Sequence, residues 1–171
     1  MAQLSKTFQL YINALDNYDE ERLLAKPSEK GWSIGQVYMH IISETNFYLS
    51  QIRLCSSNND NSSEQASDIA MAMLKANALP DELIEGPPSN ALVGQPHNKA
   101  QLAELLQALN EEITANRILL EKTSFKGKTK HPGLNYFDAK QWYQFAEMHL
   151  RHHLRQKERI DAFLNSISFG E

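Results

Sequence analysis

Residues 138–168 read DAKQWYQFAEMHLRHHLRQKERIDAFLNSIS, and this stretch does most to decide the fold. Its apolar residues recur every three or four positions, which is typical of the buried face of an amphipathic helix: Trp142, Phe145, Ile160, Phe163 and Ile167. In the middle of the stretch the same face carries His149, His153 and Gln156. Because buried polar groups need hydrogen-bond partners or a metal ion, this face predicts a site as well as a helix.

Three earlier segments have the same helical periodicity. We predict helices from about residue 4 to a stop near Pro27, from Ser33 to about Cys55, and from about Lys99 to Lys122. The second, third and fourth helices each begin with a short polar residue and a glutamine three positions later, the pattern of a capping box. The pairs are Ser33 and Gln36, Asn98 and Gln101, and Asp138 and Gln141.

The connection between the second and third predicted helices is long. Residues 56–64 (SSNNDNSSE) predict a polar loop, residues 68–79 favour a short helix, and the prolines and glycines that follow exclude regular structure. A connection of this length allows the second and third helices to run in parallel. We therefore predict an all-α fold, a four-helix bundle with a long crossover between helices two and three, as a single domain over residues 1–171. Residues 125–137 predict a further loop, with His131 as a turn residue.

The composition limits the classes of function. The 171-residue chain has a net charge of −4, so it lacks the basic surface expected for binding nucleic acid or anionic membranes. Cys55 is the only cysteine, which excludes an intrachain disulfide and fits a reducing compartment. The first residues show no apolar signal segment, and no apolar run is long enough to cross a bilayer. We expect a cytoplasmic protein whose partner is a small-molecule substrate.

The predicted metal ligands come from two helices. His149 and His153 are four residues apart, so on a helix their imidazoles share one face and can reach one ion. His40 interrupts the apolar face of the second predicted helix and is the candidate third ligand. Three histidines suit zinc, nickel or ferrous iron and leave a coordination position open for substrate. Two alternatives stay open: ordinary hydrogen-bonded histidines, and a ligand exchange in which His152 replaces His153.

Two further polar residues are candidates for catalytic roles. Glu44 lies one helical turn after His40, where its carboxylate can orient that imidazole or act as a general base on a metal-bound water. Gln156 continues the polar face one turn beyond His153 and can hydrogen-bond a metal-bound water. The alternatives are a solvated glutamate and a glutamine that bonds only to the neighbouring helix.

Three short motifs resemble the DinB-like (YfiT-like) superfamily of metal-binding four-helix bundles. They are the run GWSIGQV at residues 31–37 leading to His40, the run HLRHHLRQ at residues 149–156, and the run HPGLNYF at residues 131–137. The resemblance covers nearly the whole chain. It implies that His40, together with the H-x-x-x-H pair of the last helix, holds the divalent metal ion.

The resemblance also implies a class of reaction. Some members of the superfamily transfer low-molecular-weight thiols such as bacillithiol, mycothiol or glutathione, and others look like hydrolases. We therefore expect a metal-dependent enzyme that transfers a low-molecular-weight thiol to a small electrophile, with metal-dependent hydrolysis as the alternative. A third hypothesis is a non-catalytic metal- or ligand-binding bundle that acts through association. Members of the superfamily are often dimers, so a homodimer fits each hypothesis.

Overall fold

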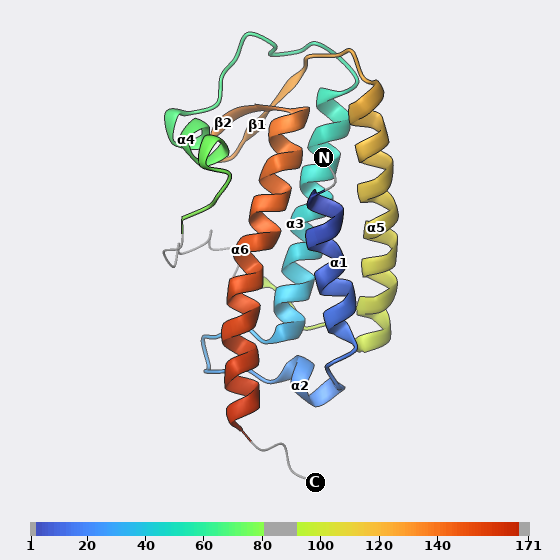
Figure 1. The fold of residues 1–171 in the computed structure, drawn as a ribbon, viewed down its shortest axis with the longest axis vertical. Coiled ribbons are helices and arrows are strands. Elements are labelled where there is room, and N and C mark those ends of the chain that lie inside the picture. The colour runs from blue at the N-terminus through green and yellow to red at the C-terminus, as the bar shows by residue number, and fades with distance from the viewer. Residues whose placement is uncertain (1–2, 81–91, 168–171) are drawn as a thin grey trace.

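Helices make up most of the fold in the computed structural model, which describes residues 3–80 and 92–167 (Figure 1). These ranges contain six helices and one two-stranded hairpin. In chain order the elements are α1 (Gln3–Leu15), α2 (Glu20–Leu24), α3 (Ile34–Cys55), α4 (Asp68–Ala76), α5 (Lys99–Lys122), β1 (Lys128–His131), β2 (Asn135–Asp138) and α6 (Ala139–Ser166). The predicted mostly helical fold is confirmed. Part of the predicted long connection, residues 81–91, lies outside the described residues.

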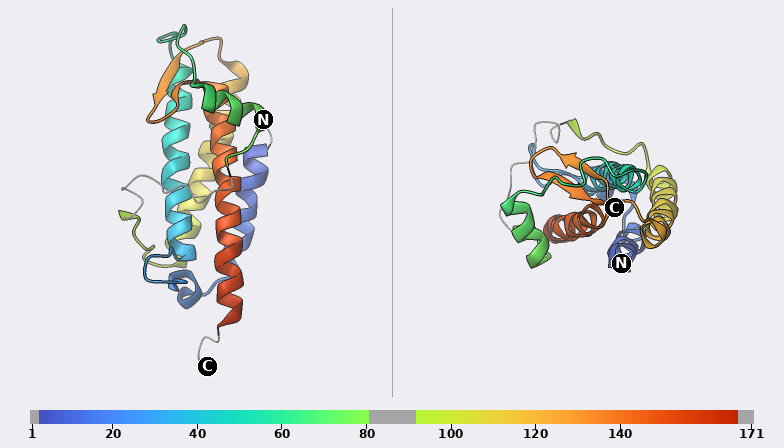
Figure 2. Two further views of the ribbon diagram at one scale, coloured as in Figure 1. Left: turned by 90° about the vertical axis from the view of Figure 1, so that its left-hand side faces the viewer. Right: turned by 90° about the horizontal axis from the view of Figure 1, so that it is seen from above.

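The four long helices, α1, α3, α5 and α6, lie side by side (Figures 1 and 2). Helix α3 packs against both α5 and α6, and α1 packs against the same two helices from the other side. The colour gradient of Figure 1 shows that α3 and α5 run in one direction while α1 and α6 run in the other. The direct packing of α3 against α6 brings together the two helices that carry the predicted metal ligands.

Side-chain caps explain where the long helices begin. The Ser33 hydroxyl accepts the backbone N–H of Gln36, whose side chain accepts the N–H of Ser33 in return. Asp138 and Gln141 form the same reciprocal pair at the start of α6, so two of the three predicted capping boxes are confirmed. At α5 only half of the pattern forms. Asn98 caps the helix, but the side chain of Gln101 accepts the backbone N–H of His97, the residue before the cap, instead of that of Asn98.

The first predicted helix is shorter than the sequence pattern indicates. Helix α1 ends at Leu15, and the chain turns before α2 begins. The Asp19 carboxylate accepts the backbone N–H of Arg22 and so caps α2 as a separate element. The prediction of one helix that stops near Pro27 was therefore wrong, because a local cap starts a new helix inside the periodic stretch.

A hairpin replaces the loop predicted for residues 125–137. Strands β1 and β2 pair antiparallel, and Asn135 follows the turn with a positive φ of 63°. Phe137 is fully buried, and the indole N–H of Trp142 donates to the Thr129 hydroxyl at 2.7 Å. His131 is the last residue of β1 and is half-buried, so its prediction as a simple turn residue was wrong. Contacts with α6 stabilise strands that are too short to show a pattern of their own.

Buried tyrosines connect three of the long helices. The Tyr11 hydroxyl of α1 donates to the carbonyl of Leu150 in α6 at 2.8 Å, and the Tyr38 hydroxyl of α3 donates to the carbonyl of Tyr11 at 2.8 Å. Both rings are fully buried. Because buried hydroxyls are costly without partners, these bonds fix the helices in register as well as packing them.

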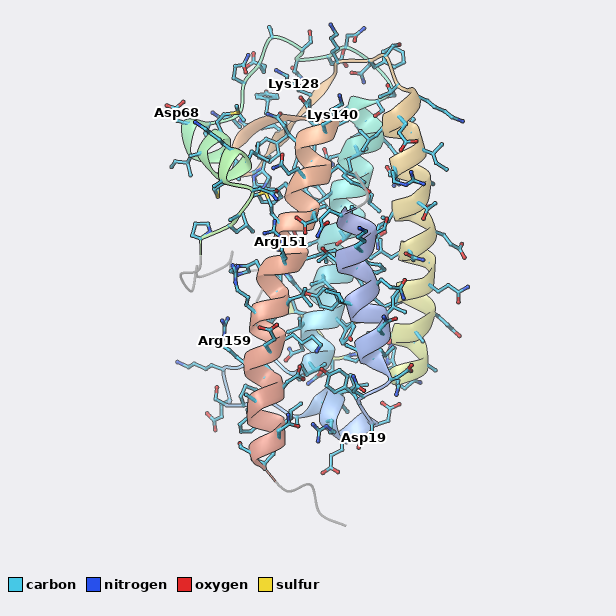
Figure 3. All side chains as sticks on the ribbon, viewed as in Figure 1. Asp19, Asp68, Lys128, Lys140, Arg151 and Arg159 are labelled. Carbon is cyan, nitrogen blue, oxygen red and sulfur yellow. The ribbon has the colours of Figure 1, made fainter. Side chains whose placement is uncertain are left out.

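Helix α4 lies beside α6 and is attached to it through its C-terminal end. The Arg151 guanidinium, which projects from α6 (Figure 3), donates to the carbonyl of Asn77 at 2.7 Å. The Gln144 amide donates to the carbonyl of Leu74 at 2.7 Å. These side chains donate to carbonyls at the C-terminal end of α4, where a helix leaves carbonyls free of its regular backbone bonds. None of the helices in the two described ranges has the length and hydropathy needed to cross a membrane.

Candidate metal centre

Three histidines meet between α3 and α6. His40 comes from α3, and His149 and His153 come from successive turns of α6. One nitrogen of each ring lies within 4.8 Å of a nitrogen of the other two, and the His149 Nε2 to His153 Nε2 distance is 3.2 Å. We call these residues the histidine triad. Their nitrogens are close enough together to bind a single ion.

Aromatic rings hold the triad from two sides. The Trp32 ring lies 4.9 Å from the His40 ring and stacks on the His153 ring at 6.4 Å, with an interplanar angle of 14°. The Tyr48 ring meets the His149 ring edge-on at 5.5 Å. Contacts of this kind limit the rotation of the imidazoles. The triad is therefore held in place by its surroundings before any ligand binds.

Burial keeps the triad uncharged. Burial, with a smaller contribution from the nearby His152, lowers the pKa of His40 to about 4. Burial also lowers the pKa of His153 to about 3, and the pKa of His149 is lowered by burial and by the other histidines. At neutral pH each ring therefore has a nitrogen lone pair, which is the form that binds metal.

The hydrogen bonds of the triad leave one polar atom without a partner. Gln156 Oε1 lies 2.7 Å from His153 Nδ1. His149 Nδ1 is buried and has no hydrogen-bond partner among the described residues. Buried polar atoms without partners are rare in folded proteins and commonly mark sites of function. Three neutral imidazoles with an unsatisfied nitrogen among them fit a divalent ion such as zinc, nickel or ferrous iron.

Glu44 is connected to the triad through Tyr48. Its side chain is half-buried, and its Oε2 accepts the hydroxyl of Tyr48 at 3.0 Å. Burial raises the pKa of Tyr48, with Glu44 adding to the effect, so the phenol keeps its proton and donates. Tyr48 therefore contacts both groups: its hydroxyl bonds to the Glu44 carboxylate, and its ring lies against the ring of His149.

His152 meets the ring of His153 edge-on, with the ring centroids 5.2 Å apart. Its ring stands at 89° to the His153 ring, and its Nδ1 lies 3.3 Å from the guanidinium of Arg155. Since a guanidinium can only donate, Nδ1 of His152 is the acceptor of that contact. The group of three residues that can hold a metal includes His153 and not His152.

Sequence reasoning missed three aromatic residues near the triad. Trp32 and Tyr48 were not among the predicted site residues. His131 stacks on Trp142 at 5.3 Å and meets the ring of Phe145 at 5.0 Å, and Phe145 lies one turn before the triad in α6. Burial lowers the pKa of His131 to about 4.

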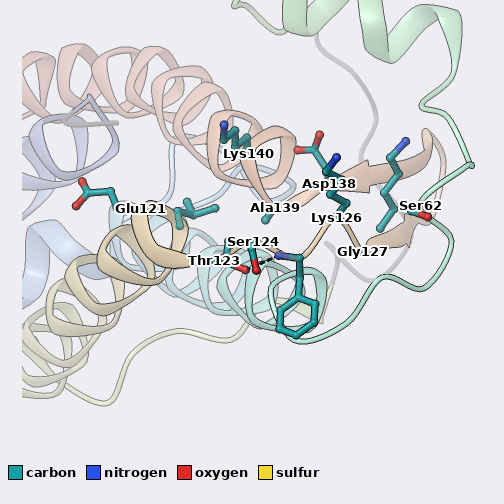
Figure 4. Close-up of a pocket in the computed structure, with 12 residues that line it drawn as sticks. Ser62, Glu121, Thr123, Ser124, Lys126, Gly127, Asp138, Ala139 and Lys140 are labelled. Atoms are coloured by element: carbon teal, nitrogen blue, oxygen red, sulfur yellow. Dashed lines mark hydrogen bonds between the residues drawn. The ribbon is translucent and has the colours of Figure 1, made fainter.

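A separate cavity of about 670 Å³ opens at the end of the molecule where α5 ends and α6 begins (Figure 4). Its lining includes Lys126, Lys140 and Asp138, and none of the triad residues. The cavity and the triad therefore do not form one site.

Comparison with known proteins agrees with the geometry. A family model described as the DinB superfamily matches residues 3–156. The chain belongs to the DinB superfamily. It is also similar to the uncharacterized protein YuaE of Bacillus subtilis (strain 168), with 25% identity over 150 residues, which are 86% of this chain and 88% of that protein. No solved structure matches this DinB superfamily member.

Proposed function

We propose that this protein is a metal-dependent enzyme whose divalent ion is held by His40, His149 and His153. One observation carries the proposal: three uncharged imidazoles from two helices meet, with one nitrogen of each ring within 4.8 Å of a nitrogen of the other two. Membership in the DinB superfamily supports it. When bound, such an ion supplies Lewis acidity. It lowers the pKa of a bound thiol or water, so that the thiol or water can lose its proton at neutral pH.

The protein side chains then have separate tasks. The three histidines would hold the ion, and Trp32 and Tyr48 limit the movement of the imidazole rings. The Glu44 carboxylate is the candidate general base, since it is half-buried and oriented by the Tyr48 hydroxyl. Gln156 was predicted as a catalytic candidate, and its amide oxygen is placed against His153.

The reaction that we propose is transfer of a low-molecular-weight thiol to a small electrophile. It follows from the resemblance to thiol-dependent members of the superfamily. Hydrolysis is the second candidate. It is favoured by the Glu44 carboxylate, which is connected to His149 through the Tyr48 ring and is a candidate base of the kind that hydrolytic metal sites use.

We also propose the finer architecture and setting that the sequence predicts. The packing and directions of α1, α3, α5 and α6 support a four-helix bundle with a long crossover between α3 and α5, in one domain over residues 1–171. A cytoplasmic location and a homodimer remain part of this proposal.

Metal binding tests the proposal most directly. We expect the purified protein to contain a divalent metal, and its melting temperature to rise when zinc or nickel is added to the metal-free form. His153→Ala should abolish this rise and, in assays with a panel of thiols and electrophiles, the activity as well. The control is His97→Ala, which removes an exposed histidine outside the site. A wild-type protein that neither contains metal nor gains stability from it would refute the proposal.

A further inference from the structure

The two histidines of α6 are held in different ways. Gln156 follows His153 by three residues on the same helical face and places Oε1 2.7 Å from its Nδ1. His149 has no such support, since its Nδ1 is buried without a partner among the described residues. The two rings meet through their Nε2 atoms, 3.2 Å apart.

These contacts determine where the protons lie. An amide oxygen can only accept, so the proton of the neutral His153 ring is on Nδ1 and its Nε2 carries a lone pair. The short distance between the Nε2 atoms is then a hydrogen bond that His149 donates to His153. Nδ1 of His149 is left as an acceptor without a donor, which agrees with its lack of a partner.

We propose that Gln156 is a positioning residue that holds His153 in the Nδ1–H tautomer and thereby presents its Nε2 to a divalent metal ion. This inference rests on the proposed metal site and assigns Gln156 a role through His153. His153 is ready to bind, because its Nε2 lone pair already faces the triad. His149 has to move its proton from Nε2 to Nδ1 before its own Nε2 can bind the same ion.

The difference makes Gln156 important for affinity. Hydrogen-bond partners behind a metal-binding histidine fix its tautomer and orientation, and their loss typically lowers metal affinity about 10–100-fold. Because the buried Nδ1 of His149 has no equivalent partner, Gln156 is the orienting group of the α6 histidine pair in the described structure. Without this amide oxygen, no hydrogen bond fixes which ring nitrogen of His153 carries the proton. The proton of His149, which bonds to His153, then has no fixed position either.

Two substitutions at Gln156 and one control test the proposal. Gln156→Leu removes the acceptor, and Gln156→Glu keeps an acceptor oxygen on a side chain of the same length. Gln51→Leu is the matched control, since Gln51 is a half-buried helical glutamine that bonds to Ser50. Zinc affinity is measured by competition with a chromophoric chelator, and the tautomer of each histidine in the metal-free protein by long-range proton–nitrogen NMR.

We expect wild-type His153 to be in the Nδ1–H form and His149 in the Nε2–H form. Gln156→Leu should weaken zinc binding about tenfold or more and give His153 a mixture of tautomers, while Gln156→Glu and Gln51→Leu keep wild-type affinity or better. The melting temperature of each metal-free variant separates a loss of affinity from a loss of folding.

Two results would overturn the inference: zinc affinity unchanged by Gln156→Leu, or a wild-type His153 protonated on Nε2. If Gln156→Leu does not fold, the wild-type NMR assignment and the Gln156→Glu variant still decide the question. A wild-type protein that binds no zinc refutes the proposed function and, with it, the role of Gln156 in presenting a nitrogen to metal. The NMR assignment then still shows whether Gln156 fixes the tautomer.

Discussion

Helix α6 carries two buried polar clusters within two turns, and they differ in how far their groups satisfy one another. On the side facing α1, the Glu147 carboxylate accepts the Thr7 hydroxyl at 2.9 Å and two nitrogens of Arg151 at 2.9 and 2.8 Å. On the side facing α3, the triad brings together imidazoles with lowered pKa values and leaves Nδ1 of His149 without a partner.

The difference separates a cluster whose groups satisfy one another from the candidate metal site. Around Glu147 a negative charge, a positive charge and a hydroxyl complete each other, so the cluster needs no ligand. In the triad three imidazoles meet, and their contacts leave Nδ1 of His149 buried without a partner among the described residues. Buried titratable groups with shifted pKa values and an unsatisfied polar atom are typical of binding and catalytic sites.

Acid should affect the triad more than any other part of the metal-free protein. The folded-state pKa values of about 4 for His40 and about 3 for His153 lie below the ordinary value of 6.5, so the unfolded chain takes up these protons first. Stability should be full above the ordinary pKa and fall as the pH is lowered toward the folded-state values. At about pH 4.5 we expect His40 and His153 together to lower the unfolding free energy by roughly 5 kcal/mol relative to neutral pH.

Urea unfolding at both pH values, with a chelator present, measures this loss. His40→Phe should remove part of the pH dependence, whereas His97→Phe, at an exposed position, should leave it unchanged. Equal pH dependence in the wild type and in His40→Phe would mean that the triad does not hold its rings uncharged.

The next largest effect is expected at the completed cluster. Glu147→Ala removes a carboxylate that is 5% exposed and leaves Arg151 and Thr7 without their acceptor, so we expect a loss of about 2 kcal/mol in unfolding free energy at neutral pH. Zinc affinity should not change. The matched control is Glu112→Ala, which breaks the exposed pair with Arg53 and should alter stability by less than about 1 kcal/mol. Weakened zinc binding in Glu147→Ala would contradict the separation of the two clusters.

The smallest effect tests the hydroxyl of the same cluster. Thr7→Val keeps the shape of the side chain but removes the bond to Glu147, and should lower the unfolding free energy by about 1 kcal/mol. Thr114→Val is the control: the exposed Thr114 hydroxyl donates to the carbonyl of Asn110 one turn earlier in α5, and its loss should have a smaller effect. The same urea titration measures both variants. Equal losses of unfolding free energy would show that the bond between Thr7 and Glu147 stabilises the fold no more than an exposed helical hydroxyl does.

Sequence patterns predicted the features that depend on neighbours along the chain. Helices α3, α5 and α6 follow from their periodicity and caps, and the pairing of His149 with His153 follows from four-residue spacing on a helix. The placement of His40 beside them was also accessible, because a polar interruption of an apolar face is visible in the sequence.

Features that depend on distant contacts were not accessible in the same way. The hairpin is held by Trp142 and a buried Phe137 rather than by its own pattern, so its four-residue strands read as a loop. Trp32 and Tyr48 look like ordinary apolar residues, and only the packing of α3 against α6 reveals their contacts with the triad. The break after Leu15 depends on a cap that competes with a continuing apolar pattern.

The position of Trp32 gives the protein an intrinsic optical probe. Of the two tryptophans in the chain, Trp32 lies against two rings of the triad, while Trp142 is fully buried and bonded to Thr129. Fluorescence of an indole responds to charge and to paramagnetic ions within a few ångströms. Occupancy of the site can therefore be followed through the emission of the natural protein, without a label and before any substrate is known.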